Sequence, residues 1–123
     1  MLRKEIPYPT RKSEHEIQAL LWYFLRKRKI DVRLEVHGFY RVDDGKNIRR
    51  RFDAVIFKDQ KPVCIIECKS WSQNYSRTQA YRKEQNSKQI QEYENIFGLP
   101  VLVVGRFEQI DNTVTEIERM VKT

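Results

Sequence analysis

Two carboxylates and a lysine stand at the ends of two apolar segments, in a spacing that suggests metal chemistry. Asp53 lies near the start of residues 52–57, FDAVIF, and Glu67 and Lys69 end residues 63–69, VCIIECK. Both segments are rich in β-branched or aromatic residues, and the five residues between them, KDQKP, are typical of a turn. The sequence therefore predicts a β-hairpin with charged side chains where the apolar pattern breaks.

The spacing predicts that the two carboxylates face each other. If Lys58–Pro62 forms a five-residue loop, counting back along the two strands places Asp53 opposite Glu67. Opposed strand residues have Cβ atoms about 4.5–5.5 Å apart, and like charges at that distance repel. A positive group is expected between them, either Lys69 on the face of Glu67 or a divalent cation with oxygen ligands. An ordinary surface hairpin whose acids happen to face each other is the other interpretation.

Composition limits the class of protein. A chain of 123 residues with 40% hydrophobic and 33% charged residues indicates one globular domain with a heavily charged surface. Lys and Arg number 24 against 17 Asp and Glu, and the net charge of +7 favours a polyanion such as nucleic acid as partner. With no apolar run of membrane length and no secretory signal, we expect no membrane partner and a cytoplasmic location. Residues 1–12 are predicted to be a basic arm and residues 13–123 a single domain.

The segment before the hairpin predicts a helix and a strand. Ser13 with Glu16 fits a capping box, and apolar residues recur at helical spacing after it. Asp31–Val42 alternates between apolar and polar residues, which predicts a strand that is buried on one side. Gly38 is expected to mark a bulge or bend in that strand.

The segment after the hairpin predicts a helix, a strand and another helix. The first helix is expected over Thr78–Phe97, where glycine and proline follow, and Val101–Phe107 is an apolar strand. Thr113 is expected to open the last helix. The predicted order is helix, three strands, helix, strand, helix.

The motif and this order together resemble a known family. Asp53, thirteen intervening residues and then Glu67-Cys68-Lys69 are similar to the signature of the PD-(D/E)XK nuclease superfamily, in which an Asp on one strand precedes a Glu-X-Lys on the next. Phe52 stands where the superfamily usually has proline. The αβββαβ order is that of the superfamily's core, so the resemblance extends from Ser13 to about Phe107.

The resemblance implies a fold and an activity. The fold would be one restriction-endonuclease-like α/β domain, with a mixed four-stranded sheet flanked by helices and an added C-terminal helix. The activity would be that of a DNA endonuclease that depends on Mg²⁺, with Mn²⁺ as a substitute, of homing, restriction or Holliday junction resolvase type. Cutting palindromic or branched DNA would require a homodimer or a higher homo-oligomer. The alternative is a nucleic-acid-binding module that keeps the fold without catalysis.

The resemblance also implies roles for single residues. Asp53, Glu67 and the backbone carbonyl of Cys68 would hold the metal ion. Lys69 would position and activate the attacking water. Gln89, one helical turn before Tyr93, resembles the QxxxY element of the RecB-like branch, which helps to position the catalytic centre.

A glutamate on the first helix completes the implied metal site. The run SEHEIQALLWYFLR resembles the opening helix of Holliday-junction-resolvase-like and VRR-NUC members, and many members of the superfamily carry a metal-associated Glu there. At about 100° per residue, Glu14 projects closer to the centre of the apolar stripe than Glu16. Glu14 is therefore the favoured ligand, and Glu16 is the alternative, with a capping role as its other interpretation.

Basic and aromatic residues near the hairpin predict contacts with nucleic acid. The arginine triplet before Asp53 is expected to contact phosphates, and a solvated charge run is its alternative. After Lys69, basic residues are interleaved with aromatics that can stack on bases, although a flexible loop entering a helix would have the same composition. The candidate nucleic-acid-binding residues are Arg49, Arg50, Arg51, Trp71, Tyr75, Arg77, Arg82, Lys83, Lys88 and Tyr93.

Overall fold

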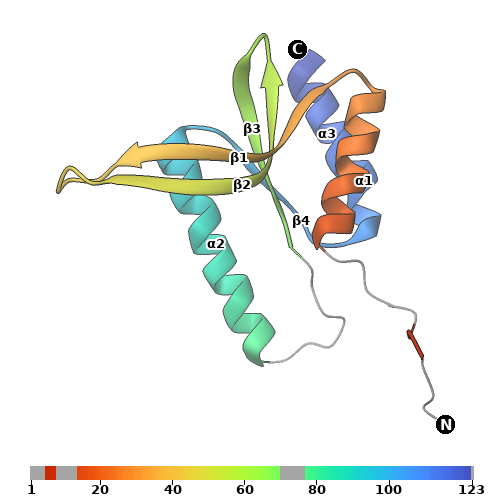
Figure 1. Cartoon of the computed structure of the whole chain (residues 1–123), viewed down its shortest axis with the longest axis horizontal. Coiled ribbons are helices and arrows are strands. Elements are labelled where there is room, and N and C mark those ends of the chain that lie inside the picture. Colours follow the sequence, from red (N-terminus) through yellow and green to blue (C-terminus); the bar gives the residue numbers. More distant parts are fainter. Residues whose placement is uncertain (1–4, 8–13, 70–76, 123) are drawn as a thin grey trace.

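The fold is a mixed four-stranded sheet with helices on both faces (Figure 1). The computed structural model describes residues 5–7, 14–69 and 77–122, with side chains from residue 87 onward in the last range. The elements are α1 (Glu14–Lys27), β1 (Asp31–Arg41), β2 (Asn47–Lys58), β3 (Lys61–Cys68), α2 (Arg77–Phe97), β4 (Val101–Val104), the 3-10 turn η1 (Phe107–Gln109) and α3 (Ile110–Lys122).

The sheet topology confirms the predicted fold class. The strand order is β1-β2-β3-β4; β2 is antiparallel to both β1 and β3, and β4 is parallel to β3. Parallel neighbours need a long crossover connection, and α2 supplies it. The order of helices and strands is the predicted one, including the C-terminal helix.

The turn between β2 and β3 is shorter than predicted. Asp59 and Gln60 have φ angles of 52° and 66° and form a two-residue turn, while Lys58 already pairs with Lys61. Two positive φ angles match the twist of tight hairpins, which explains why both strands continue up to the turn. The predicted five-residue loop Lys58–Pro62 is therefore wrong.

Beyond the turn, the register is nevertheless the predicted one. A register shift after Ile56 compensates for the shorter loop, and Ala54 pairs with Ile66. The same register, carried one residue further, places Asp53 beside Glu67.

Two hydrophobic cores cover the two faces of the sheet, and the strands change faces at Asp53. Ala54 lies in the core beneath α1 and α3, whereas Phe52 and Val55 both lie in the core beneath α2. Regular alternation would put Phe52 and Ala54 on one face. Glu35, which the β1–β2 register places opposite Asp53, has a φ of 52°, a left-handed conformation that is uncommon outside glycine. Both strands bend near their middle (Figure 1).

Past the bend, β1 and β2 form a hairpin arm, residues 36–52, that lies over α2 (Figure 1). Gly38 pairs regularly with Arg50 in this arm, so the predicted bulge or bend at Gly38 is wrong. The reason for glycine is close packing. A Cβ atom at this position would lie 2.6 Å from Cε2 of Phe52 and 3.1 Å from the ring of Phe97.

Gly38→Ala is expected to loosen the arm. The added methyl group cannot fit without moving the Phe52 ring, which is only 3% exposed. Overpacking of this kind lowers the free energy of unfolding by about 1–3 kcal/mol. Urea denaturation measures the change, with His37→Ala on the exposed side of the arm as control. Equal stability of Gly38→Ala and wild type would contradict the packing described here.

Two predicted boundaries near the C-terminus need correction. β4 ends at Val104 rather than Phe107, and the 3-10 turn follows. α3 begins at Ile110 rather than Thr113. Thr113 lies inside the helix, and its hydroxyl donates to the carbonyl of Gln109, four residues earlier, at 2.8 Å. Ser13 and most of residues 1–12 lie outside the described residues. None of the described helices has the length and apolar character needed to cross a membrane.

Candidate active site

Asp53 is held by contacts on two sides. Its Oδ2 accepts the backbone N–H of Cys68 at 2.7 Å, which ties β2 to the end of β3. Its backbone carbonyl accepts a hydrogen bond from Nε2 of Gln18 on α1, also at 2.7 Å. The Asp53 carboxylate is therefore fixed at the point where the strands change faces.

Glu67 is a buried carboxylate next to Asp53. The residue is only 7% exposed, and its Oε1 is buried without a hydrogen-bond partner. Burial raises the pKa of Glu67 to about 7, and the charge of Asp53 and a side-chain hydrogen bond with it add to the increase. The positive charge of Lys69 opposes this change. An unpaired buried oxygen beside a second carboxylate is the arrangement that a hard cation relieves.

Lys69 and Glu14 bring one positive and one further negative charge to the site. The backbone N–H of Lys69 donates to the carbonyl of Val104 at 2.9 Å, which anchors the residue directly after β3, beside the end of β4. Glu14, exposed in the first turn of α1, contributes to the raised pKa of Glu67. Glu16 is exposed in the same turn.

The donor set fits Mg²⁺ in part. Within the described ranges, no three His, Cys, Asp or Glu side chains are grouped so that they could hold a metal ion. Mg²⁺ commonly keeps several waters and takes only one or two protein carboxylates, so Asp53 and Glu67 are sufficient for this mode of binding. Cys64 and Cys68 are free, buried thiols whose pKa values burial raises to about 12, so at neutral pH neither offers a thiolate to a metal ion.

The predicted Gln89–Tyr93 pair connects α2 to this site. Nε2 of Gln89 donates to the Tyr93 hydroxyl at 3.0 Å, and the Tyr93 ring packs edge-on against Phe52. Tyr93 is 3% exposed, and burial raises its pKa, with a smaller increase from Glu67 and a decrease from Arg50. Tyr93 is thus a core aromatic within electrostatic reach of Glu67.

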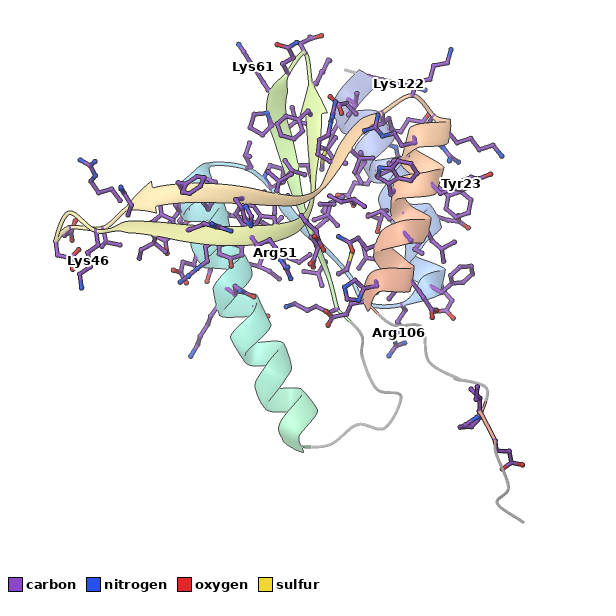
Figure 2. The ribbon with its side chains drawn as sticks, viewed as in Figure 1. Tyr23, Lys46, Arg51, Lys61, Arg106 and Lys122 are labelled. Atoms are coloured by element: carbon purple, nitrogen blue, oxygen red, sulfur yellow. The ribbon has the colours of Figure 1, made fainter. Side chains whose placement is uncertain are left out.

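The arginine triplet is split between the faces of the arm. Arg49, Arg50 and Arg51 are all exposed. The positive charge of Arg50 lowers the pKa of Tyr93, which lies on the α2 side of the arm. On the opposite side, Nη2 of Arg49 lies 3.1 Å from Nε2 of His37. Figure 2 shows Arg51 beside the bend.

The other predicted nucleic-acid contacts are described only in part. Lys88 is exposed on α2. Trp71 and Tyr75 lie outside the described residues. Arg77, Arg82 and Lys83 belong to α2, but their side chains are also outside the described part of the structure.

A comparison with protein families places the chain in a wider group. Residues 15–110, well over half of the 123, match the family described as the type I restriction enzyme R protein N terminus. The chain belongs to this family. The match includes all four strands with Asp53, Glu67 and Lys69, and it begins one residue after Glu14. A search of curated proteins found no match.

In this member of the family, Gln18 is a site residue that the sequence interpretation missed. It is 8% exposed and lies one helical turn after Glu14, on the buried face of α1. A polar residue inside the apolar stripe, between Ile17 and Leu21, is the signal that could have revealed it. Glu35, opposite Asp53, gives no comparable signal, because nothing in its type indicates a positive φ.

Proposed function

We propose that this restriction-enzyme-related domain is a metal-dependent DNA endonuclease of the PD-(D/E)XK type. The observation that carries the proposal is the buried, unpaired Oε1 of Glu67 next to the fixed carboxylate of Asp53. Lys69 follows Glu67 by two residues, directly after the C-terminal end of β3. Family membership supports the proposal, because the family takes its name from the R protein of type I restriction enzymes.

The proposed roles follow from position and charge. Asp53, Glu67 and the backbone carbonyl of Cys68 would hold Mg²⁺, with Glu14 in reach of the same ion through water. When bound, Mg²⁺ would supply Lewis-acid stabilisation of the charge that develops on the phosphate oxygens. Lys69 would orient the attacking water and stabilise it as it loses its proton.

A non-catalytic nucleic-acid-binding module is the second candidate. The observation that favours it is the lack, within the described residues, of a third side-chain ligand beside Asp53 and Glu67. The presence of Asp53, Glu67 and Lys69 together at the C-terminal end of β3 favours catalysis. Cutting both strands would need two such domains, so we also propose a homodimer or higher homo-oligomer on DNA.

A cleavage panel separates the two candidates. Linear, flapped, single-stranded and four-way-junction DNA would be incubated with the 123-residue chain in Mg²⁺, in Mn²⁺ and in chelator. An endonuclease gives internal cleavage products that depend on the metal and identify the preferred DNA structure. Binding without products under every metal condition would support the binding module instead.

The arginine triplet gives a prediction about affinity. Replacing Arg49, Arg50 and Arg51 with alanine should weaken DNA binding and reduce the slope of log K against log salt concentration, by about 0.9 for each phosphate that is no longer neutralised. Fluorescence anisotropy over a salt series measures both quantities. Lys46→Ala, at the tip of the arm in Figure 2, is a matched control for the removal of an exposed charge. A triple variant with the wild-type salt slope would make the arginines ordinary solvated residues.

A further inference from the structure

The hairpin arm has one packed face and one exposed face. Val36, Gly38, Tyr40 and Ile48 on one side are half-buried, and the Tyr40 ring meets Phe97 of α2 edge-on. The side chains on the other side, which we call the outward face, are all exposed. The outward face consists of His37, Phe39 and Arg41 on β1 and Asn47, Arg49 and Arg51 on β2.

The outward face is basic and regular. Its side chains form three cross-strand pairs: His37 with Arg51, Phe39 with Arg49, and Arg41 with Asn47. Three of the six are arginines and none is acidic. Phe39 is 66% exposed, although large aromatic side chains are usually much more buried. This face lacks the apolar continuity of a protein interface and instead complements a polyanion.

We propose that the outward face enters the major groove of duplex DNA and reads base pairs next to the cleavage site. This inference rests on the proposed function, since it makes the arm the specificity element of that nuclease. A two-stranded ribbon, with strands about 4.8 Å apart, fits a major groove about 12 Å wide. Arginine pairs with guanine, asparagine with adenine, and an aromatic side chain with the thymine methyl group. Phe39, Asn47 and the arginines thus provide chemistry for base edges as well as for phosphates.

The dimensions set the length of the recognised sequence. Outward residues on one strand are two positions apart, which is about 6.7 Å, or two base-pair steps of about 3.4 Å. Three rows of side chains therefore span about four base-pair steps, which is about 5 base pairs. Arg51 is two residues from Asp53 on β2 and lies beside the bend (Figure 2). If the arm lies in the major groove, the adjacent phosphate backbone of the DNA is therefore close to the candidate active site.

Substitutions of uncharged side chains on the outward face separate the recognition of bases from the binding of phosphates. The 123-residue chain would select sequences from randomised duplexes in chelator, so that no cleavage occurs, and Phe39→Ala and Asn47→Ala would be treated in the same way. The wild type should select a motif of about 5 base pairs. Each variant should lose preference at one or two of these positions and bind the selected duplex roughly 5- to 100-fold more weakly. The salt slope should not change, because neither substitution removes a positive charge.

Two substitutions outside the arm serve as matched controls. Tyr23→Ala and Asn112→Ala remove an exposed aromatic and an exposed amide from α1 and α3, outside the arm, and should keep the motif. A wild type without any preferred sequence, or arm variants that keep the full motif while remaining folded, would overturn the inference. Selection without cleavage in Mg²⁺ would support the arm's role and refute the nuclease, whereas cleavage without selection would do the reverse.

Discussion

Lys69→Ala should reduce the rate of DNA cleavage by about 10²–10⁴-fold, the usual contribution of a positioned group that assists proton transfer. The backbone N–H of Lys69 donates to the carbonyl of Val104, and its positive charge acts on Glu67 beside Asp53. DNA binding should stay nearly intact, because the substitution removes only one positive charge. Single-turnover cleavage and anisotropy measure the two effects separately.

Lys61→Ala is the matched control for Lys69→Ala. Lys61 is exposed and begins β3 beside the turn (Figure 2), whereas Lys69 directly follows the other end of that strand. Both variants lose the same charge, so a general electrostatic effect on DNA binding would change them equally. Our assignment of Lys69 would be wrong if the Lys69 variant cut DNA as fast as the Lys61 variant.

The order of elements and the strand register could be predicted from the sequence because they depend on short-range patterns. Period-two alternation marked β1, β-branched and aromatic residues marked β2 and β3, helical spacing marked α1, and the glycine and proline after Phe97 marked the end of α2. The register put Asp53 beside Glu67 even though the turn was wrong, because a register shift after Ile56 compensated for the shorter loop. Hydrophobic burial on one face makes a strand tolerate a change in its turn more readily than a slip in its register.

The shape of the site could not be predicted, because it depends on contacts between distant residues. At Asp53 the strands change faces, Glu35 has a positive φ, and Phe52 packs beneath α2. No local sequence pattern indicates any of these three features. The role of Gly38 likewise depends on Phe97, which lies 59 positions later in the chain. Gln18 could be recognised as unusual in its helix, but its partner, the carbonyl of Asp53, could not.

The stability of the metal-free protein should fall as pH rises. The pKa of Glu67 is raised in the folded protein to about 7 from an ordinary value of 4.5, so between these values the folded state binds more protons than the unfolded state. Stability then decreases with increasing pH over this window and levels off above about 7. At 1.36 kcal/mol per pKa unit, the total loss is about 3 kcal/mol.

Mg²⁺ should reverse this loss. A cation bound between Asp53 and Glu67 favours the charged form of Glu67 that burial disfavours, and a ligand that binds only the folded state raises its melting temperature. The gain in melting temperature should be larger at pH 8 than at pH 6, because Glu67 is largely protonated at the lower pH.

Asp53→Asn tests whether the two carboxylates share the ion. The amide oxygen of asparagine can still accept the N–H of Cys68, so the hydrogen bond seen at 2.7 Å is kept while one negative charge is lost. Without that charge, the pKa of Glu67 should fall, and the variant should be at least as stable in chelator at pH 8 as the wild type. It should gain little from Mg²⁺ and should not cut DNA.

Melting curves of both proteins, with Mg²⁺ and with chelator at pH 6 and pH 8, decide between the two outcomes. Asp43→Asn is the control, because it removes the same charge from an exposed turn of the arm. If Asp53→Asn is clearly less stable than wild type in chelator, or gains as much from Mg²⁺ as wild type does, Asp53 and Glu67 do not share a metal ion. In that case Lys69 would have no bound metal ion beside which to position water.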